Sequence, residues 1–550
     1  MNSIEQLQGA FSHYLMQTFS IDSKTAQQCA LILNTDELKQ LFGDLNSNAT
    51  MVLAKQLGKP PRAIAQTIVE TFKHPSIANI EIAGPGFLNL FLCQEALINL
   101  SHELIEHPTS FFIPSPDHQK RSVLIEFVSA NPTGPLHFGH GRGGIIGDVL
   151  ANVLSFLGNK VVKEFYIKDA GAQIQKLGNS LFIRCQQAAG IEAQLPEEAY
   201  NGSYLQDIAA DLIKTNGQQI LNKPLRFFEQ YGKEMLLARL KTTLSVYGIE
   251  FDVWFSEKTL HEGGEIEDAL LILQGKGHLY EQEGALWFRS TDFGDDKDRV
   301  VKKADGTYTY VAADIAYMRN KIKRGFNELV MTLGHDHHSY VVRLQALLQA
   351  LGLAQNNTLE VILYQLVKIK ESGLMVRMSK RAGNMITLDD VIQEVGTDVA
   401  RFFYLNRKAD AQLEFDLELA TKKSDDNPVY YIQYAYVRTK SILDKAQEAG
   451  FKISPNPRMS AVGSDEALLI KKIASLKAIL HDIGTHFQTH ILAYYTVELS
   501  QLFSKYYAKH RIVDTENLQT SNDRLTLVTM IRNTLELCFN LMGISKPERM

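Results

Sequence analysis

Apolar residues in the middle of the chain form short strand-like runs that alternate with a stretch at helical spacing, and this alternation predicts a parallel sheet crossed by helices. Residues 123–127 form a short apolar run of the buried-strand type. From Ile145 to Leu157 the apolar positions recur at helical spacing, and Gly158 follows as a C-terminal cap before a second strand begins at Val161. Strand, helix and strand in this order form a βαβ unit, the element of a Rossmann-type doubly wound sheet. Further strands of the same sheet are predicted at 329–333 and 361–364.

The two ends of the chain carry different patterns. Residues 1–112 combine helical stretches with apolar runs at 77–82 and 87–92, which flank the turn signal Gly84-Pro85-Gly86 and predict a small α/β domain ending in a hairpin. Residues 396–550 show long helical patterns and few strand signals, which predicts an all-α domain. We therefore expect three domains, 1–112, 113–395 and 396–550, and we interpret residues from about 175 to 300 as insertions in the middle domain.

Composition narrows the class of protein. Of the 550 residues, 45% are hydrophobic and 22% are charged, as in ordinary soluble proteins. No segment approaches the roughly 20 apolar residues that a membrane helix needs, and the N-terminus lacks the features of a secretory signal, so we expect a cytoplasmic protein without a membrane partner. The four cysteines lie far apart, which argues against structural zinc and disulfides. A net charge of -5 neither supports nor excludes RNA binding.

The loop between the first strand and the helix indicates a nucleotide site. It contains Pro132, Gly134 and Pro135 and then reads His137-Phe138-Gly139-His140. Glycine lets a nucleotide approach the backbone, and a helix N-terminus offers amide donors to phosphate. Hydrogen bonds from two histidines to a pentacoordinate α-phosphate would act mainly in the transition state. An isolated His-x-x-His is more often a metal pair or two surface histidines, but the strand before it and the helix after it favour a catalytic pair, similar to the first signature of class I aminoacyl-tRNA synthetases.

A basic segment far downstream reads Val376-Arg377-Met378-Ser379-Lys380-Arg381. Alone, such a run would be interpreted as a solvated charged loop. Together with the histidines it resembles the KMSKS-type second signature of the class I enzymes, in which a flexible ammonium follows the charge that grows on departing pyrophosphate. The resemblance implies that Lys380 is catalytic and that Met378, Ser379 and Lys380 bind ATP, while Arg377 replaces the family's first lysine.

A third polar patch, Gly334-His335-Asp336-His337-His338, follows a predicted strand. It is similar to the class I loop that holds the ATP ribose and the amino acid, which implies ATP contacts from Gly139, Gly334 and Asp336. A metal cluster is the alternative. Neighbouring histidines on one short loop seldom all face one ion, and no cysteine lies nearby, so we favour Asp336 as a ribose acceptor and expect no protein-held metal.

The resemblance is narrower than class I. Residues 125–137 are similar to the arginyl-tRNA synthetase form of the first signature. Other parts of that family are similar to the segments at 166–171, 310–317, 398–401 and 546–550. The signature loop comprises Ala130, Asn131, Pro132, Thr133, Gly134, Pro135, Leu136, His137, Phe138, Gly139 and His140. The resemblance implies an enzyme that uses ATP with Mg2+, and no zinc, to make arginyl-adenylate and transfer arginine to tRNA(Arg), with bound tRNA needed for activation. We expect it to act as a monomer.

The arginine contacts of that family fall here on Glu126, Asn131, Tyr310, Asp314 and His338. A guanidinium needs planar carboxylate or carbonyl acceptors, which these residue types supply. Tyr310 and Asp314 are one helical turn apart, so both can reach one pocket. Each residue alone could equally be a structural polar group, and some family members have Gln at the position of His338. Because a site with several buried acceptors rejects smaller amino acids, no editing domain is expected.

The same resemblance assigns tRNA contacts to the helical end of the chain. Tyr431, Ala435, Tyr507 and Met550 are the expected anticodon-loop contacts, and the N-terminal domain is similar to the module that touches the tRNA elbow. Tyrosines in helices more often pack in a core, although exposed ones can stack on unpaired bases. Two other functions remain as alternatives: a synthetase-like protein that holds tRNA without charging it, and a class I synthetase for another amino acid.

Overall fold

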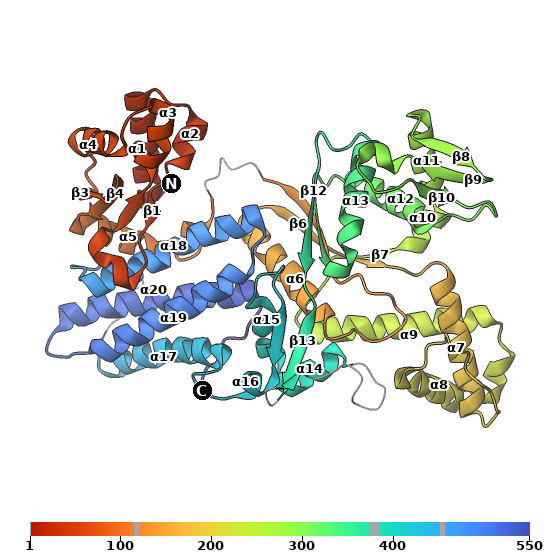
Figure 1. The fold of residues 1–550 in the computed structure, drawn as a ribbon. Helices are drawn as coiled ribbons and strands as arrows, with labels where there is room; N and C mark the ends of the chain where they lie inside the picture. Colours follow the sequence, from red (N-terminus) through yellow and green to blue (C-terminus); the bar gives the residue numbers. More distant parts are fainter. Residues whose placement is uncertain (1, 115–119, 372–373, 376–385, 452–456) are drawn as a thin grey trace.

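The computed structural model describes residues 2–114, 120–371, 374–375, 386–451 and 457–550, and its centre is a five-stranded parallel sheet (Figure 1). The strands run in the order β12-β11-β5-β6-β7. They are β5 (Ser122–Glu126), β6 (Lys160–Ile167), β7 (Val253–Ser256), β11 (Glu328–Gly334) and β12 (Thr358–Tyr364). Successive strands are added outward from β5 in one direction and then in the other, so the winding reverses between β5 and β11. This confirms the doubly wound sheet and the strands expected near 123, 161, 329 and 361.

Alternating apolar residues of β5 cover both faces of the sheet. Val123 and Ile125 belong to a core that contains α6 (His140–Phe156) and the C-terminal helices, whereas Leu124 belongs to a second core with α12 (Tyr310–Lys323) and α13 (His338–Ala350). A parallel sheet is normally buried on both sides because its crossover helices cover it. The short apolar run at 123–127 therefore describes a strand buried on both faces, as expected from the sequence.

The interpretation of residues 175–300 as insertions is wrong in part. Residues 253–256 form β7, the edge strand of the main sheet, which pairs in parallel with β6. A true insertion precedes it: α7 (Ala172–Ala188), α8 (Ser203–Asn216) and α9 (Leu225–Val246) enclose a small core of their own. After β7 come the short elements α10 (Glu257–Glu262), α11 (Glu265–Gly275), β8 (Leu279–Gln282), β9 (Ala285–Phe288), η4 (Ser290–Phe293) and β10 (Arg299–Lys302). The three strands among them form a separate antiparallel sheet.

The N-terminal module has the expected hairpin, β3 (Ile77–Ala83) against β4 (Phe87–Leu92), in a four-stranded sheet of order β1-β2-β4-β3. Its other elements are α1 (Ser3–Phe19), α2 (Ser23–Gln28), β1 (Ile32–Leu33), η1 (Glu37–Phe42), β2 (Leu45–Ser47), α3 (Ala49–Leu57) and α4 (Pro61–Thr71). The module does not end at the hairpin, because α5 (Gln94–Glu106) and η2 (Ser110–Phe112) follow. Lys471 joins the module to the C-terminal helices through hydrogen bonds of 2.8 Å to Gln40 and Asp44.

Four long helices form most of the C-terminal region (Figure 1). They are α17 (Pro428–Glu448), α18 (Ser464–His486), α19 (His490–Lys509) and α20 (Leu518–Met542). The region from 396 is not all helical, because β15 (Leu413–Asp416) pairs in parallel with β13 (Val367–Glu371), which also pairs with β14 (Leu374–Met375). The connecting helices are α14 (Leu388–Val395), α15 (Thr397–Leu405) and α16 (Leu417–Thr421). None of the helices in the described part of the chain is long and apolar enough to cross a membrane.

Arg401, fully buried on α15, ties the central sheet to the C-terminal helices. Its guanidinium donates to the Asp148 carboxylate of α6 at 2.6 Å, to the Tyr247 carbonyl after α9 at 2.9 Å and to the Met542 carbonyl of α20 at 2.9 Å. Asp148 also contacts the Lys163 ammonium of β6 at 3.3 Å. Removing one member of such a buried network leaves the others without partners, which is strongly destabilising. Arg401 therefore fixes α6, and the loop before it, relative to the C-terminal region.

Arg401→Leu should lower the free energy of unfolding by about 3 to 5 kcal/mol, because Asp148 and three carbonyl oxygens lose a donor. The measurement is the midpoint of urea unfolding, followed by circular dichroism. Arg458→Leu is the control, since its ion pair with Glu95 is exposed on both sides and should leave the midpoint close to that of the unmodified protein. Equal midpoints for the two variants would contradict the assigned role of Arg401.

Candidate functional site

The candidate site lies where the winding of the sheet reverses, at the carboxyl ends of β5 and β11. These strands pair in parallel with Glu126 opposite Met331, so the loops that follow Glu126 and Gly334 start side by side. A cavity of about 520 Å³ lies between them and is lined by residues of both loops, α10, α12 and α13. Ligands of doubly wound proteins bind at this position.

The chain leaves β5 through a strained bend. Val128 and Ser129 have φ values of +65° and +41°, in the left-handed region that a β-branched residue such as valine rarely adopts. The Ser129 hydroxyl holds the bend, because it donates to the Glu126 carboxylate at 3.1 Å and accepts from the Tyr166 backbone N–H at 3.1 Å. The bend brings Ala130 and Asn131 to the wall of the cavity. Nothing in the sequence analysis indicated it.

His140 begins α6 and His137 lies in the loop just before it, and each has one ring nitrogen engaged. The Nδ1 atom of His137 accepts from the Gly139 N–H and that of His140 from the His137 N–H, both at 3.0 Å. A neutral imidazole that accepts at Nδ1 carries its proton on Nε2. Burial, with a smaller contribution from His140, lowers the pKa of His137 to about 4, and burial lowers the pKa of His140. Both rings are therefore neutral near pH 7, and each keeps an Nε2–H donor for a phosphoryl oxygen.

The rest of the signature loop is fixed by packing and backbone hydrogen bonds. Leu136 and Phe138 are buried, and the Tyr404 hydroxyl donates to the Phe138 carbonyl at 2.7 Å. Close packing explains the glycines that follow. A side chain at Gly141 would meet the Tyr404 ring at 2.8 Å, and one at Gly143 would meet the Tyr364 ring at 2.6 Å.

Two acidic side chains in the cavity have a raised pKa. Burial raises the pKa of Asp314 on α12 to about 6, although Tyr340, Lys168 and Arg343 oppose the shift. Burial and the neighbouring Asp314 raise the pKa of Glu257, at the start of α10, to about 7. Two buried carboxylates in one cavity, where the charge of Asp314 also disfavours that of Glu257, favour a cationic ligand, because a cation would compensate both charges.

Sequence reasoning missed Glu257. The residue follows β7 directly, in the stretch that was interpreted as insertion, so its position at the carboxyl end of a sheet strand was not recognised. The run Val253-Trp254-Phe255 before it is the signal that could have identified the strand. Glu257 is almost fully buried and lines the cavity together with Asp314 and Tyr166.

Three further residues expected to contact the amino acid line the cavity, but one of them is already ion-paired within the protein. Asn131 and Tyr310 line the cavity, and Tyr310 is 61% exposed at the first turn of α12. Glu126 lines it too, but the carboxylate of Glu126 is already ion-paired with the buried Lys321 and accepts from Ser129. Its charge is therefore compensated within the protein by a direct ion pair. The attraction of Lys168 to Asp314 and Glu257, and of Arg343 to Asp314, does not prevent burial from raising the pKa of both carboxyls. We assign Glu126 to holding the bend and the wall of the cavity.

The patch after β11 forms a one-turn 3-10 helix, η5 (His335–His337), before α13. Gly334 and Asp336 line the cavity, with the Asp336 side chain 71% exposed. His338 is exposed and stacks on His335 with ring centroids 5.8 Å apart, and it is not among the described residues that line the cavity. Among the residues that the structure describes, no three His, Cys, Asp or Glu side chains are grouped to hold a metal ion.

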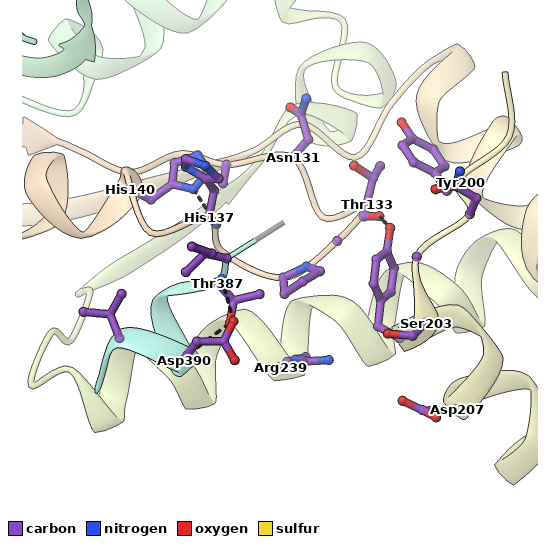
Figure 2. Close-up of a pocket in the computed structure, with 18 of the residues that line it drawn as sticks. Asn131, Thr133, His137, His140, Tyr200, Ser203, Asp207, Arg239, Thr387 and Asp390 are labelled. Atoms are coloured by element: carbon purple, nitrogen blue, oxygen red, sulfur yellow. Dashed lines mark hydrogen bonds between the residues drawn. The ribbon is translucent and has the colours of Figure 1, made fainter. Parts of the chain in front are cut away.

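The basic segment with Met378, Ser379 and Lys380 lies outside the described residues. The residues after it are placed against the histidine segment: the Phe138 N–H donates to the Ile386 carbonyl at 3.2 Å and the Leu388 N–H to the Leu136 carbonyl at 2.8 Å. A second cavity, of about 1030 Å³, lies at this junction and shares Ala130, Asn131 and His140 with the first (Figure 2). The residues that follow the basic segment therefore lie against the histidine segment, although the two are far apart in the chain.

Three of the four expected RNA contacts lie on or against α17: Tyr431 and Ala435 belong to it, and Tyr507 of α19 packs on its Arg438. Tyr431 is partly exposed, whereas Ala435 is 2% exposed, so the side chain of Ala435 packs inside the protein. Tyr507 of α19 packs on the Arg438 guanidinium, 4.9 Å from its ring centroid, and Tyr434 packs on the same guanidinium at 4.4 Å. Arg438, between two tyrosine rings, is a cationic group that the sequence analysis did not single out.

The C-terminal tail is held by a series of polar contacts. The Ser545 N–H donates to the Asp398 carboxylate at 2.9 Å, and the Lys546 ammonium pairs with Glu536 at 2.9 Å. Glu548 is ion-paired with Lys440 of α17. Met550 follows and is 48% exposed. The end of the chain is therefore docked on α15, α17 and α20.

Comparisons with known proteins cover every part of the chain. Three family models match: arginyl tRNA synthetase N terminal domain at residues 5–92, tRNA synthetases class I (R), catalytic domain, at 113–408, and DALR anticodon binding domain at 432–550. The chain is 43% identical to an arginine--tRNA ligase of Citrifermentans bemidjiense over 520 residues, which cover 92% of this chain and 93% of that one. It is 38% identical to one of Bacillus cereus over the full length of both.

A solved structure has the same fold. Arginyl-tRNA synthetase of Thermus thermophilus is similar over 100% of both chains, with a TM-score of 0.74 and 21% identity. The catalytic family model extends to residue 408, beyond the boundary expected at 395. This agrees with the position of α15, which lies against α6 and holds Asp148 through Arg401.

The raised pKa values of Asp314 and Glu257 predict that a guanidinium ligand binds more weakly as the pH falls. Glu257 loses its charge as the pH drops below about 7 and Asp314 as it drops below about 6, while a guanidinium stays charged. The dissociation constant of free arginine, measured by calorimetry, should therefore rise as the pH falls from 8 to 5.5. Below the pKa of each carboxylate, that group should contribute a rise of roughly tenfold per pH unit. Binding near pH 6.5 should also release protons, which calorimetry in buffers of different ionisation enthalpy counts.

Asp314→Asn supplies the control, because it keeps the shape and removes one titrating group. It should weaken arginine binding at pH 8, flatten the pH dependence and reduce the number of released protons. Since burial disfavours the charge of Asp314, the neutral variant should be no less stable than the unmodified protein. A dissociation constant that stays the same across this pH range would rule out the two carboxylates as the cation site.

Proposed function

Because this chain belongs to the arginyl-tRNA synthetase family, we propose that it activates arginine with ATP at the cleft between β5 and β11 and transfers the arginyl group to the 3' adenosine of tRNA(Arg). The observation that carries this proposal is the pair Asp314 and Glu257, two carboxylates of raised pKa in a cavity that also reaches His140. A cation site beside neutral imidazole donors fits a cationic amino acid whose carboxylate must meet the α-phosphate of ATP.

In the first step the arginine carboxylate attacks the α-phosphorus and pyrophosphate leaves. His137 and His140 donate from Nε2 to oxygens of that phosphorus, where negative charge grows in the transition state. The ammonium of Lys380 follows the charge of the departing pyrophosphate, and Met378 and Ser379 bind ATP beside it, in keeping with the family's second signature. Gly139 and Gly334 let the nucleotide approach the backbone, and Asp336 accepts from its ribose. The products of this step are arginyl-adenylate and pyrophosphate.

Specificity follows from the cost of leaving carboxylates without a partner. A guanidinium presents five N–H donors in a planar fork, which suits two carboxylates that approach from α10 and α12. Asn131 and Tyr310 complete the polar wall of the cavity. A smaller or neutral amino acid would leave Asp314 and Glu257 repelling each other, so it is rejected without an editing step.

Mg2+ enters this proposal together with ATP, where it neutralises charge on the phosphates. The described residues hold no cluster of three metal-ligating side chains, and Asp336 is the exposed carboxylate beside Gly334. That arrangement fits an ion held mainly by phosphate oxygens, because Mg2+ usually takes only one or two carboxylates from a protein. The ion is therefore part of the bound substrate.

In the second step the terminal ribose of tRNA attacks the arginyl carbonyl, and AMP leaves. We assign recognition of the anticodon loop to the partly exposed Tyr431, to Tyr507 with Arg438, and to Met550. Ala435 supports this surface from inside. The N-terminal module contacts the tRNA elbow. We further propose that the protein acts as a monomer in the cytoplasm.

Aminoacylation tests the function directly. Each of the twenty amino acids is offered with ATP, Mg2+ and total tRNA, and arginine alone should be charged. Glu257→Gln removes one carboxylate and keeps the shape, so the apparent KM for arginine should rise by one to two orders of magnitude, about 1.5 to 3 kcal/mol, while that for ATP changes little. Charging of another amino acid, or of none, would refute the proposed function, and equal changes in both constants would make Glu257 structural.

Removal of residues 548–550 tests the docked tail. Chain ends usually tolerate deletion, so a tail without a function predicts no change in tRNA binding. If Met550 contacts the anticodon loop, the truncated protein should bind tRNA(Arg) more weakly by about 1 to 3 kcal/mol, the range for one lost stacking contact, while its melting temperature barely changes. Because the lost contact is mainly apolar, the slope of log affinity against log salt should stay the same.

Full-length Glu548→Gln is the matched control, since it breaks the ion pair with Lys440 but keeps Met550. It should bind tRNA(Arg) nearly as well as the unmodified protein. A truncated protein that binds within about twofold of the intact one, well below the loss expected for a stacked base, would remove Met550 from the site.

A further inference from the structure

A tyrosine from the helical insertion reaches the signature loop. Tyr204 lies in the first turn of α8, and its hydroxyl donates to the Thr133 carbonyl at 2.8 Å. Residues of the same segment, Tyr200 and Ser203, line the larger cavity opposite Asn131 and Thr133 (Figure 2). The contact joins two parts of the chain that are 71 residues apart.

The signature loop is supported from two sides. Its second half is held by the segment at 386–388, through the hydrogen bonds of Leu136 and Phe138, and by the Tyr404 hydroxyl. In its first half the Thr133 N–H donates to the Asn131 carbonyl at 2.8 Å, within the loop itself. Among the hydrogen bonds of the described residues, the one from the Tyr204 hydroxyl joins this half to another element.

Gly134 packs against the same hydroxyl. A Cβ atom at this position would lie 3.1 Å from Tyr204 Oη and 3.4 Å from Cζ, which is tighter than nearly all real contacts of a Cβ atom. The absence of a side chain at Gly134 therefore lets Tyr204 approach Thr133. Burial raises the pKa of Tyr204 to about 12, so the hydroxyl keeps its proton and its role as a donor throughout the neutral range.

We propose that Tyr204 is a positioning residue for adenylate formation: through its hydrogen bond to Thr133 it holds the first half of the signature loop, and thereby the spacing between Asn131 and the two histidines. The helical insertion thus sets the geometry of the phosphate donors. This inference rests on the proposed function. Because catalysis depends on donors placed to within a fraction of an ångström, loosening one half of the loop slows the chemical step without removing a reacting group.

The cation site does not depend on this contact. Asp314 and Glu257 come from α12 and α10, and the Tyr204 hydroxyl does not line their cavity. Tyr204→Phe keeps the ring and removes the hydroxyl. It should therefore lower kcat for tRNA-dependent pyrophosphate exchange by roughly tenfold, which corresponds to about 1.4 kcal/mol, while the KM for arginine and the melting temperature stay unchanged.

The control is Tyr231→Phe, the same chemical change in the same helical insertion. Tyr231 of α9 packs on Phe227 and lines neither of the two cavities that meet at the signature loop. All rates are divided by the fraction of molecules that bind arginine in calorimetry, so that a loss of folded protein is not counted as slower chemistry. Tyr231→Phe should match the unmodified protein in kcat.

Gly134→Ala gives an independent test by coupling. In the unmodified background the new methyl group meets the Tyr204 hydroxyl, so kcat should fall. In the Tyr204→Phe background that hydroxyl is gone, and the same substitution should cost at least threefold less, because contacting residues are not additive. Additive effects of the two substitutions would overturn the proposal.

Three further outcomes would also overturn it: an unchanged kcat in Tyr204→Phe, a parallel loss of kcat and arginine affinity, or a lowered melting temperature that accounts for the loss. The proposed function fails separately and earlier, if the unmodified protein shows no arginine-dependent pyrophosphate exchange. A failure of the Tyr204 proposal in an active enzyme leaves that function standing.

Discussion

The parallel pairing of β5 with β11 is the constraint on which the site depends. Because the sheet is wound outward from β5 in both directions, α6 and α13, the helices that follow these two strands, lie on opposite faces, and the loops after Glu126 and Gly334 open into one cavity. The first loop carries the histidines, and the second carries Asp336. The edge strand β7 brings Glu257 to the same side of the sheet. Among the described residues, the histidines, Asp336 and Glu257 thus follow the carboxyl ends of strands, whereas Asp314 reaches the cavity from the second turn of α12.

Electrostatics then determine what the cavity accepts. Glu126 faces the cavity too, but it is ion-paired with Lys321, so Asp314 and Glu257 are the buried carboxylates left to meet a ligand, beside Lys168 and Arg343 of the same cavity. Burial makes their ionised forms costly, and this cost is what a guanidinium relieves and a neutral ligand does not. The same burial keeps His137 and His140 neutral. A cationic imidazolium would repel the arginine beside it, so neutral donors suit a pocket that must hold a cation and stabilise an anion a few ångströms apart.

What the sequence predicted well was local. The βαβ unit, the histidine loop and the polar patch after β11 are each contained in one short segment, and the strands buried on both faces have long apolar runs. The misses were non-local. β7 has four residues that are all only partly buried, so its pattern is weak, and Glu257 was missed with it. The neutralisation of Glu126 depends on Lys321, 195 residues away. Burial of Ala435, and the bend at Val128, likewise arise from packing that no spacing of residues along the chain reveals.

The nucleotide site is supported by parts of the chain that lie far from it in sequence. Arg401 holds α6 from the side of the C-terminal helices, and Tyr204 holds the loop before α6 from the side of the helical insertion. An elongated RNA substrate that spans the molecule would contact one or both of these regions. A ligand shifts an equilibrium only through its difference in affinity for the two states. The RNA can therefore change the geometry of the histidines only if it binds better when α6 and its loop are in the reactive position. If arginine activation depends on bound tRNA, as the family resemblance implies, through such a shift, the site must have two arrangements that differ in their affinity for the RNA. The arrangement described here, with both contacts formed, is the one in which His137 and His140 have their Nε2–H groups free to donate.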